Sequence, residues 1–219
     1  MLVGKQGTEY GFLRPEIFTF GQLVYFPGRG HPIEVFNDGL PLGHLTDKIH
    51  IGEHIPLGQL IDLLVTQIRQ SRHYILPQFV AAHQQSQTTV ELDNLCHALL
   101  GNHVARRASL RQGQAFIATC RQAFDYNAID QLLEQVRNKT IRGHLVPAFG
   151  YITRALEISL HEGAELFLFT MIRDLISSAV RLNIIGPLAA QSIWPQLDNE
   201  FTLVLKHCKS YCLSNIAQT

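Results

Sequence analysis

The sequence of 219 residues lacks an excess of charge of either sign, because eighteen basic and eighteen acidic residues give a formal net charge of zero. A neutral chain has no overall attraction for nucleic acid or for an anionic membrane surface. The basic residues Arg106, Arg107 and Arg111 cluster on one helical stretch, which fits a solvated or partner-facing patch better than a nucleic-acid footprint. We therefore expect no nucleic-acid partner.

Cysteines and long hydrophobic runs are also scarce. Four cysteines do not make a disulfide framework, which favours a reducing compartment. The first residues lack the apolar stretch that follows the basic start of a secretory signal. The apolar segment 166–182 is interrupted by Arg173-Asp174, and the uncharged run 182–197 is too short to span a bilayer. We expect a cytoplasmic protein with no membrane partner.

Motifs of nucleotide and hydrolytic enzymes are missing. The sequence has no G-x-x-x-x-G-K-[ST] phosphate loop, and Gly28-Arg29-Gly30 lacks the third glycine of a dinucleotide loop. It has neither a G-x-S-x-G nucleophile elbow nor an HEXXH zinc motif. We predict that the protein is not an enzyme, and that any nucleotide-driven step uses a nucleotide site on a partner.

Eleven histidines raise the question of a metal site. His50 and His54 are four residues apart, and His207 lies near Cys208 and Cys212. Neither group has the paired C-x-x-C spacing of a closed zinc site, so we interpret them as ordinary surface or core residues and expect no tightly bound cofactor. A helical metalloprotein or enzyme that uses the N-terminal histidines is kept as an alternative.

Glycine is concentrated at the start of the chain. More than half of the sixteen glycines lie in residues 1–56, where helical periodicity is poor. From residue 57 onward, apolar residues recur at three- and four-residue spacing. We predict an irregular N-terminal segment over 1–56, an all-helical domain over 57–212 and a tail over 213–219. Roughly seven to eight or more helices with short connections predict an all-α, single-domain helical bundle.

Two capping boxes mark the starts of helices. Thr88 with Glu91, and Ser159 with Glu162, have the three-residue spacing of this motif. They predict helices that begin near residues 89 and 160.

Prolines predict where other helices are interrupted. A stripe over 57–68 is followed by a second helical piece from about Tyr74, with Pro77 as a kink or a first-turn residue. Gly186-Pro187 separates the long helix from a last helix, or pair of helices, that runs to about Tyr211.

The long helix that begins at residue 160 has an apolar face and a polar stripe. The apolar face contains Leu168, Ile172, Leu175, Ile176, Ala179 and Val180. The stripe contains Thr170, Asp174, Ser177 and Arg181. The small residues Ser177 and Ser178 fit either close helix packing within the chain or close contact with another subunit, and the sequence leaves both open.

Three segments in series resemble the urease accessory protein UreF family. Leu92-Asp93 followed by NHVARRASLRQG at 102–113 resembles the family helix "nhvaRrASraQG". The segment 143–150, with Gly-His and then Pro-Ala-Phe-Gly, resembles the start of the next family helix. The segment 178–191 is similar to "sAavRLg.iGp...Q". The family's N-terminal segment has only an echo at 25–31, and its C-terminal "ySRLF.S" has no counterpart, so roles of those ends are not carried over.

The resemblance implies a non-enzymatic, all-α protein that assists nickel delivery to apo-urease. It further implies a homodimer that binds a UreH/UreD-type accessory protein and a UreG-type GTPase, with nickel handled by the complex. The alternative from another class is a divergent helical interaction module unrelated to urease. Candidates for partner or dimer contact, or for supporting the fold, are Arg106, Arg107, Ser109, Gln112, Gly113, His144, Phe149, Gly150, Asp174, Ser177, Ser178, Arg181, Gly186 and Gln191.

Overall fold

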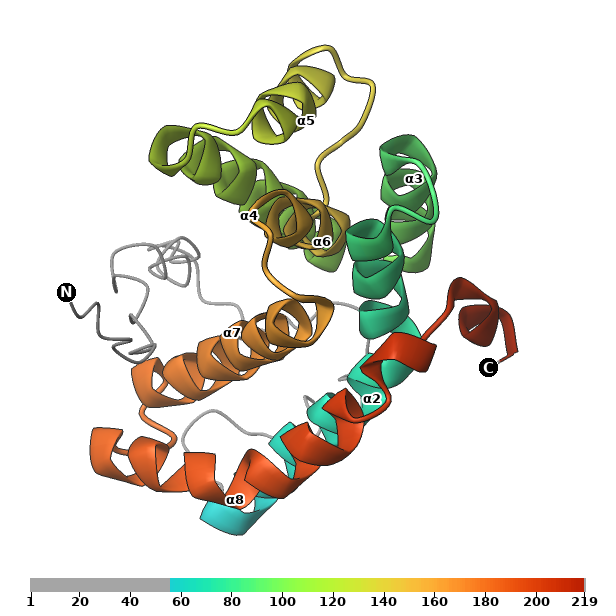
Figure 1. The fold of residues 1–219 in the computed structure, drawn as a ribbon. Helices are drawn as coiled ribbons and strands as arrows, with labels where there is room; N and C mark the ends of the chain where they lie inside the picture. The colour runs from blue at the N-terminus through green and yellow to red at the C-terminus, as the bar shows by residue number, and fades with distance from the viewer. Residues whose placement is uncertain (1–55, 219) are drawn as a thin grey trace, which may run out of the picture.

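The protein is all-α in the part of the chain that its computed structural model describes, residues 56–218 (Figure 1). The predicted irregular segment, the echo at 25–31, and His50 and His54 lie outside the described residues. The elements are α2 (Leu57–Gln84), α3 (Thr89–Leu99), α4 (His103–Ala123), α5 (Asn127–Arg137), α6 (Leu145–Ala155), α7 (Leu160–Arg181), α8 (Pro187–Leu205) and two short 3-10 helices, η2 (Cys208–Ser210) and η3 (Leu213–Gln218).

Both predicted capping boxes are present. At α3, the Glu91 N–H donates to the Thr88 hydroxyl at 3.2 Å, and the Thr88 N–H donates back to the Glu91 carboxylate at 2.9 Å. Ser159 and Glu162 make the same pair of bonds at the start of α7, at 3.3 and 3.2 Å. Each box satisfies backbone donors that a helix start leaves without partners, and an N-cap contributes about 1 kcal/mol.

Helix α2 continues through Pro77, so the division into two helical pieces was wrong. Pro77 lacks the N–H that would bond to the carbonyl four residues earlier. The residues around it are buried, with Leu76 and Phe79 at 0% and Val80 at 2% exposure. Burial of this apolar turn against α6 and α7 offsets the missing hydrogen bond, because tertiary packing supplies most of the stability of protein helices.

The last helical stretch is a pair of helices, one of the two arrangements that the sequence left open. Helix α8 ends at Leu205, and the short η2 follows it to Ser210. The Tyr211 hydroxyl donates to the Val204 carbonyl at 2.8 Å, which fastens the turn back onto the last residues of the helix. A side chain therefore satisfies a carbonyl that a longer helix would have paired internally.

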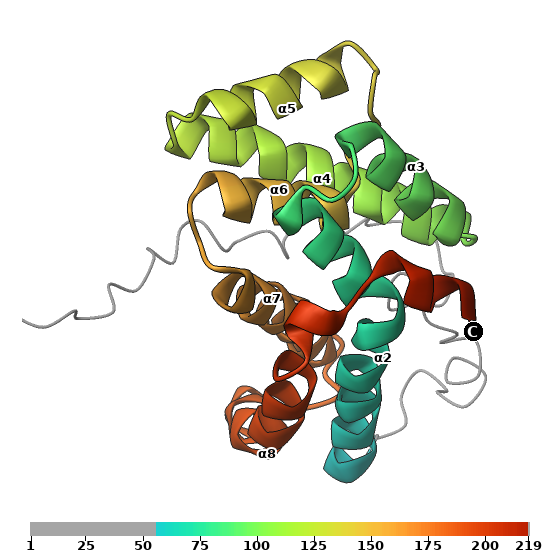
Figure 2. The ribbon, with the colours of Figure 1, turned by 45° about the vertical axis from the view of Figure 1, so that its right-hand side comes forward.

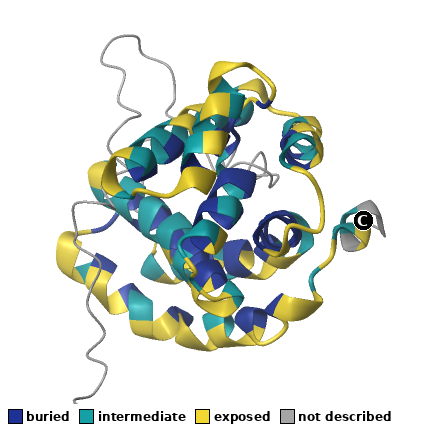
Figure 3. Cartoon of the chain, turned by 45° about the horizontal axis from the view of Figure 1, so that its top comes forward, coloured by how far each residue is buried: buried dark blue, intermediate teal, exposed yellow. Residues whose placement is uncertain are grey.

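The helices form two packed groups that share α6. The long helix α2 packs on α7 and α8, while α4 packs on α5, and α6 contacts both groups (Figures 1 and 2). Apolar side chains on the inward faces are buried, and the outer faces are exposed (Figure 3). Phe149 of α6 joins the two cores, because its ring stacks on Phe116 of α4 at 4.8 Å and meets Phe167 of α7 edge-on at 5.1 Å. Among residues 56–218, no helix combines the length and apolar character needed to cross a membrane.

Candidate functional site at the junction of α3, α4 and α6

Asp93 of α3 caps the start of α6 from a different helix. Its carboxylate accepts hydrogen bonds from the backbone N–H groups of Arg142 at 2.7 Å, Gly143 at 2.9 Å and His144 at 3.0 Å. The residue is 2% exposed. These three hydrogen bonds come from the turn that ends at His144, the N-cap of α6, and they compensate the burial of the carboxylate. The bond network fixes the turn before α6 to the buried face of α3.

His144, the N-cap of α6, is fully buried between two polar partners. Its Nδ1 lies 3.1 Å from the Ser109 hydroxyl, and its Nε2 shares a hydrogen bond with His97 Nδ1 at 3.1 Å. Burial is the main cause that lowers the pKa of both histidines, for His144 to about 4. Burial therefore favours the neutral form of both imidazoles, and the bond between the two ring nitrogens needs the accepting nitrogen to be unprotonated.

The Ser109–His144 pair does not make a hydrolytic triad. In such a triad the carboxylate bonds to a histidine ring and the serine meets the substrate. Here the Asp93 carboxylate accepts from backbone amides, and Ser109 is 5% exposed with its hydroxyl also accepting from the Leu145 N–H at 3.4 Å. These polar groups hold three helices together rather than face a substrate.

Two glycines allow α4 to lie directly against this turn. A Cβ on Gly113 would stand 2.6 Å from the Leu145 nitrogen and 2.7 Å from the His144 carbonyl carbon. Gly143 has a φ of +83°, a left-handed conformation that glycine adopts without strain. Gly113 therefore permits direct contact between the backbone of α4 and the start of α6, and Gly143 permits the positive φ of the turn.

The next two motif residues are structural as well. Phe149 is 5% exposed and lies between the two cores. A Cβ on Gly150 would stand 2.7 Å from both the Ala82 side chain and the Phe79 carbonyl oxygen of α2. Gly150 therefore permits the close approach of α6 to α2.

The remaining motif residues of α4 are nearer the surface. Arg106 is half-buried, and its Nε donates to the Leu100 carbonyl at 2.9 Å, closing the turn between α3 and α4. Gln112 is half-buried, whereas Arg107 is exposed. Of these three residues, Arg106 has a structural role, because its hydrogen bond to the Leu100 carbonyl stabilises the turn between α3 and α4.

The third family segment lies apart from this junction, on α7 and α8. The Ser178 hydroxyl donates to the Asp174 carbonyl at 2.8 Å and accepts from Arg181 Nη2 at 3.0 Å. Arg173 Nη2 donates to the Asp174 carboxylate at 3.2 Å, and burial raises the pKa of Asp174. Ser177 and Asp174 are half-buried and Arg181 is exposed. Gly186, the N-cap of α8, and Gln191 are exposed.

Sequence reasoning named neither Asp93 nor His97 as a candidate. Asp93 lies three residues before Cys96 and seven before Leu100, and all three are buried on one side of α3. An acidic residue in register with a buried helical face is a signal of a specific partner, because an isolated buried charge is costly. Its partners are about fifty residues away, however, so the pattern on α3 alone does not identify them.

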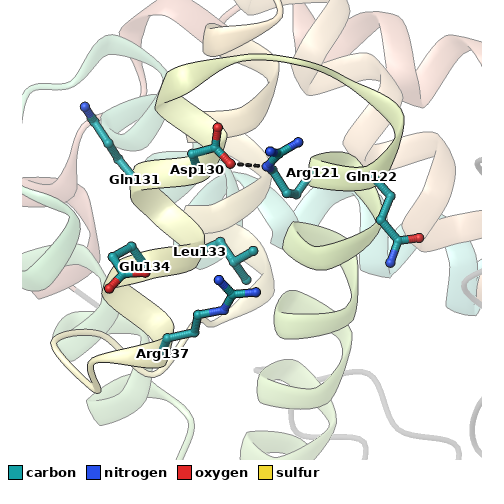
Figure 4. Close-up of a pocket in the computed structure, with 7 residues that line it drawn as sticks. All are labelled: Arg121, Gln122, Asp130, Gln131, Leu133, Glu134 and Arg137. Atoms are coloured by element: carbon teal, nitrogen blue, oxygen red, sulfur yellow. Dashed lines mark ion pairs between the residues drawn. The ribbon is translucent and has the colours of Figure 1, made fainter.

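A pocket opens between the end of α4 and α5, on the outside of the molecule (Figure 4). It is lined by Arg121, Gln122, Asp130, Gln131, Leu133, Glu134 and Arg137. Arg121 and Asp130 form an ion pair across it (Figure 4). Two arginines and two carboxylates line the pocket, so its lining favours neither an anionic nor a cationic ligand. The lining residues include no nucleophile.

In the described part of the chain, no group of three or more histidine, cysteine or acidic side chains is arranged to hold a metal ion. Cys208 is buried, and burial raises the pKa of its thiol to about 11, which opposes the thiolate form that metals bind. Cys212 is exposed. That His207, Cys208 and Cys212 are ordinary residues stays a prediction.

Comparison with known proteins places this architecture. The UreF family model matches residues 58–198. Urease accessory protein F of rice (Oryza sativa subsp. indica) is 31% identical over 160 residues, which are 71% of this chain and 61% of the rice protein. UreF of Sporosarcina pasteurii is 28% identical over 102 residues, or 47% of this chain and 50% of that protein. Urease accessory protein 6 of Cryptococcus neoformans is 32% identical over 125 residues, covering 47% of this chain and 39% of that protein.

The match follows the elements already described. It begins in the first turn of α2 and ends in α8, so it includes the junction of α3, α4 and α6 and the polar stripe of α7. The chain spans less than two thirds of the length of the rice relative. On the extent of the family match, the chain belongs to the UreF family.

Proposed function

We propose that this chain is a non-enzymatic urease accessory protein that acts in the cytoplasm and assists maturation of apo-urease. The observation that carries the proposal is the family match across residues 58–198, which covers most of the described helices. The relatives from rice and Sporosarcina pasteurii are named urease accessory proteins. The buried family residues support it, since they form a packed framework rather than a substrate site.

The proposed mechanism is assembly. The chain bridges a UreH/UreD-type accessory protein and a UreG-type GTPase, and it forms a homodimer. Nickel is the cargo of this complex, and no cofactor is held tightly by the chain itself. The absence of a phosphate loop in the sequence supports a division of labour in which the partner binds and hydrolyses the nucleotide.

The surface proposed for dimer or partner contact runs along α7 and α8. Ser177 and Ser178 are small, which allows another backbone to approach closely, and Arg181 beside them is exposed. Phe169 is 40% exposed, and its ring stacks on Trp194 of α8 at 4.7 Å. Aromatic residues and arginines are enriched in the cores of protein interfaces, so this surface combines the side chains that interfaces favour.

Co-purification tests the proposal. The full chain is produced with UreH/UreD-type and UreG-type proteins and apo-urease, and urease activity is measured after nickel is supplied. The proposal requires a complex that contains the chain and higher urease activity than without it. A chain that binds none of these proteins overturns the urease assignment and favours a helical interaction module of another pathway.

Arg181→Ala tests the α7 surface within the same assay. Arg181 lies at the last position of α7, and the variant is expected to weaken complex formation about tenfold or more, because interface arginines are frequent hot spots. Arg154→Ala, a change at an exposed arginine on α6, is the matched control and leaves assembly unchanged. If Arg181→Ala lowers the melting temperature but assembles normally, the stripe supports the fold and the interface lies elsewhere.

A further inference from the structure

Two serine or threonine residues in the described part of the chain have an arginine three positions before them. Ser109 follows Arg106, and Thr140 follows Arg137. Many protein kinases recognise a basic residue at this position, because carboxylates in their substrate groove pair with it. A kinase must also reach the hydroxyl group, so the fold decides which of the two residues can accept a phosphate.

The fold closes the first of these positions. Ser109 is 5% exposed and belongs to the buried side of α4. Its hydroxyl lies 3.1 Å from His144 Nδ1 and accepts from the Leu145 N–H at 3.4 Å. A kinase can reach this hydroxyl only if α4 separates from the start of α6, although two arginines precede it in the sequence.

The second position is open. Thr140 and the three residues before it are exposed, in the connection from α5 to α6 at the outside of the molecule (Figure 1). The Thr140 N–H donates to the Gln135 carbonyl at 2.9 Å, which holds the backbone of the turn against the end of α5. Within residues 56–218 no hydrogen bond uses the Thr140 hydroxyl, so this group is accessible and has no role in capping or in the core.

Basic residues gather around this hydroxyl. Arg137, Lys139 and Arg142 are exposed and lie within three residues of Thr140, and we call them the basic turn. In the part of the chain that the structure describes, neither Arg137 nor Lys139 forms an ion pair or a side-chain hydrogen bond. Glu134 precedes the turn, and residues 135–156 contain no aspartate or glutamate. Like charges on a short turn repel, so the basic turn favours an anion beside it.

Arg142 connects the basic turn to the junction of α3, α4 and α6. Its Nη1 donates to Asn94 Oδ1 at 2.6 Å and lies 3.7 Å from the Asp93 carboxylate. Its side chain makes no other hydrogen bond within residues 56–218, so most of its five N–H donors stay available to a further acceptor. Positive charge suits the end of α5 but not the start of α6, so the helix dipoles do not explain the whole turn.

We propose that Thr140 is a phosphorylation site for a protein kinase that recognises Arg137, and that the basic turn binds the phosphate. The γ-phosphoryl group of a nucleoside triphosphate is transferred to the Thr140 hydroxyl oxygen. A P–O bond forms there, the P–O bond to the β-phosphate breaks, the nucleoside diphosphate leaves, and a base of the kinase takes the hydroxyl proton. The product has about −1.5 to −2 charges at pH 7 and three acceptor oxygens, which match the donors of guanidinium groups.

The modification changes the surface and the link to α3 together. The formal charge of the basic turn is +3, and the phosphate lowers it to about +1 to +1.5. A phosphate two residues before Arg142 also competes with Asn94 for the guanidinium group, because a charged acceptor binds it more strongly than a neutral amide. The backbone bond from the Arg142 N–H to Asp93, at 2.7 Å, does not depend on that side chain and is retained.

The test treats the folded full chain with the catalytic subunit of cyclic-AMP-dependent protein kinase, ATP and Mg²⁺, and locates phosphate by mass spectrometry. A synthetic peptide with the sequence of residues 103–113 is the control, since it contains Ser109 outside the fold. We expect the kinase to modify Ser109 in the peptide, and in the full chain to modify Thr140 and leave Ser109 unmodified.

Variants test the recognition of Arg137. Thr140→Val keeps the shape of the side chain without its hydroxyl, and it should abolish incorporation at this position. Arg137→Gln should slow phosphorylation of Thr140 at least about tenfold, because the kinase loses a charged pair. Arg154→Gln removes the same charge from an exposed arginine of α6 and should leave the rate within about twofold.

Phosphorus NMR tests whether the basic turn binds the phosphate. Nearby cations favour the dianion, so the second pKa of the phosphate on Thr140 should lie below its ordinary value of about 6. In phosphorylated Arg142→Gln and Lys139→Gln chains this pKa should move back toward the ordinary value, whereas Arg154→Gln should leave it unchanged. Circular dichroism of each variant checks that the helices are retained.

Three results would overturn the phosphorylation site: no phosphate on Thr140, phosphate on Ser109 in the folded chain, or an unchanged rate for Arg137→Gln. An ordinary phosphate pKa in the parent chain would overturn its binding by the basic turn. None of these measurements uses the urease proteins. A chain that is phosphorylated on Thr140 but fails to assemble with those proteins therefore overturns the urease assignment alone.

Discussion

Replacing Gly113 by alanine is expected to lower the free energy of unfolding by about 3 to 5 kcal/mol. The added Cβ would stand 2.6 Å from the Leu145 nitrogen and 2.7 Å from the His144 carbonyl carbon, well inside van der Waals contact. All the nearest atoms belong to the backbone, so no side chain can rotate away. The turn before α6 has to move from α4, and that movement stretches the bonds that Asp93 makes to the Gly143 and His144 N–H groups, at 2.9 and 3.0 Å.

The magnitude is the sum of two effects. Overpacking of a tight contact costs about 1 to 3 kcal/mol, and each weakened bond from a buried carboxylate adds about 1 kcal/mol or more. The total is a large part of the 5 to 15 kcal/mol that stabilises an ordinary domain. With a urea m-value of about 2 kcal/mol per molar, the midpoint of unfolding should fall by about 2 M.

Urea unfolding followed by circular dichroism at 222 nm is the assay, and Gly58→Ala is the matched control. Gly58 lies in the first turn of α2, and a Cβ there would meet no heavy atom within 4 Å. The same substitution at that site should be neutral or stabilise by up to about 1 kcal/mol. A Gly113→Ala protein that unfolds within about 1 kcal/mol of the parent would refute the backbone-to-backbone contact between α4 and the start of α6.

Other perturbations of the junction and its neighbours have defined outcomes. Asp93→Ala should lower the unfolding free energy by about 3 kcal/mol or more, because it leaves two buried N–H groups and one partly buried N–H group without an acceptor. A loss below about 1 kcal/mol by urea titration would contradict the role of Asp93. Burial lowers the pKa of His144 and His97, so below pH 6.5 the unfolded chain binds more protons than the folded chain. The free energy of unfolding should therefore fall by about 1 to 3 kcal/mol between pH 6.5 and pH 4. Unchanged urea midpoints across that range would refute this pH dependence. Thr88→Ala, which removes the side-chain half of the α3 capping box, should cost about 1 kcal/mol in the same assay, and no change would show that the box is dispensable.

Local signals predicted much of the fold, because helix starts are encoded within four residues. Thr88 and Ser159 each meet a glutamate three positions later, and both helices begin where that spacing places them. The signals failed where a distant contact decided the outcome. Pro77 opposes a helix locally, but the turn around it is buried against α6 and α7, and this packing keeps α2 continuous.

The candidate site shows the same division. The segments 102–113 and 143–150 were recognised, and the structure brings them together at Ser109 and His144. The carboxylate that organises them, Asp93, accepts its hydrogen bonds from backbone N–H groups, which any residue type except proline supplies, so no pattern of residue types specifies these bonds. Periodicity does not show which exposed residues contact partners, because Arg107 and Arg181 fit a helical pattern equally well.

Helix α2 is the first described helix to be synthesised, yet one of its main packing partners is the last long helix. Its apolar side meets α7 and α8, and α8 ends about 120 residues after α2 does. At about 5 to 20 residues per second, translation takes roughly 6 to 24 seconds to complete α8, and until then α8 does not cover the apolar side of α2. During this interval the nascent chain exposes Leu60, Leu64 and Ile68, a surface suited to a chaperone or to a second nascent chain. A stop codon anywhere before α8 would therefore release an aggregation-prone fragment rather than a smaller folded protein.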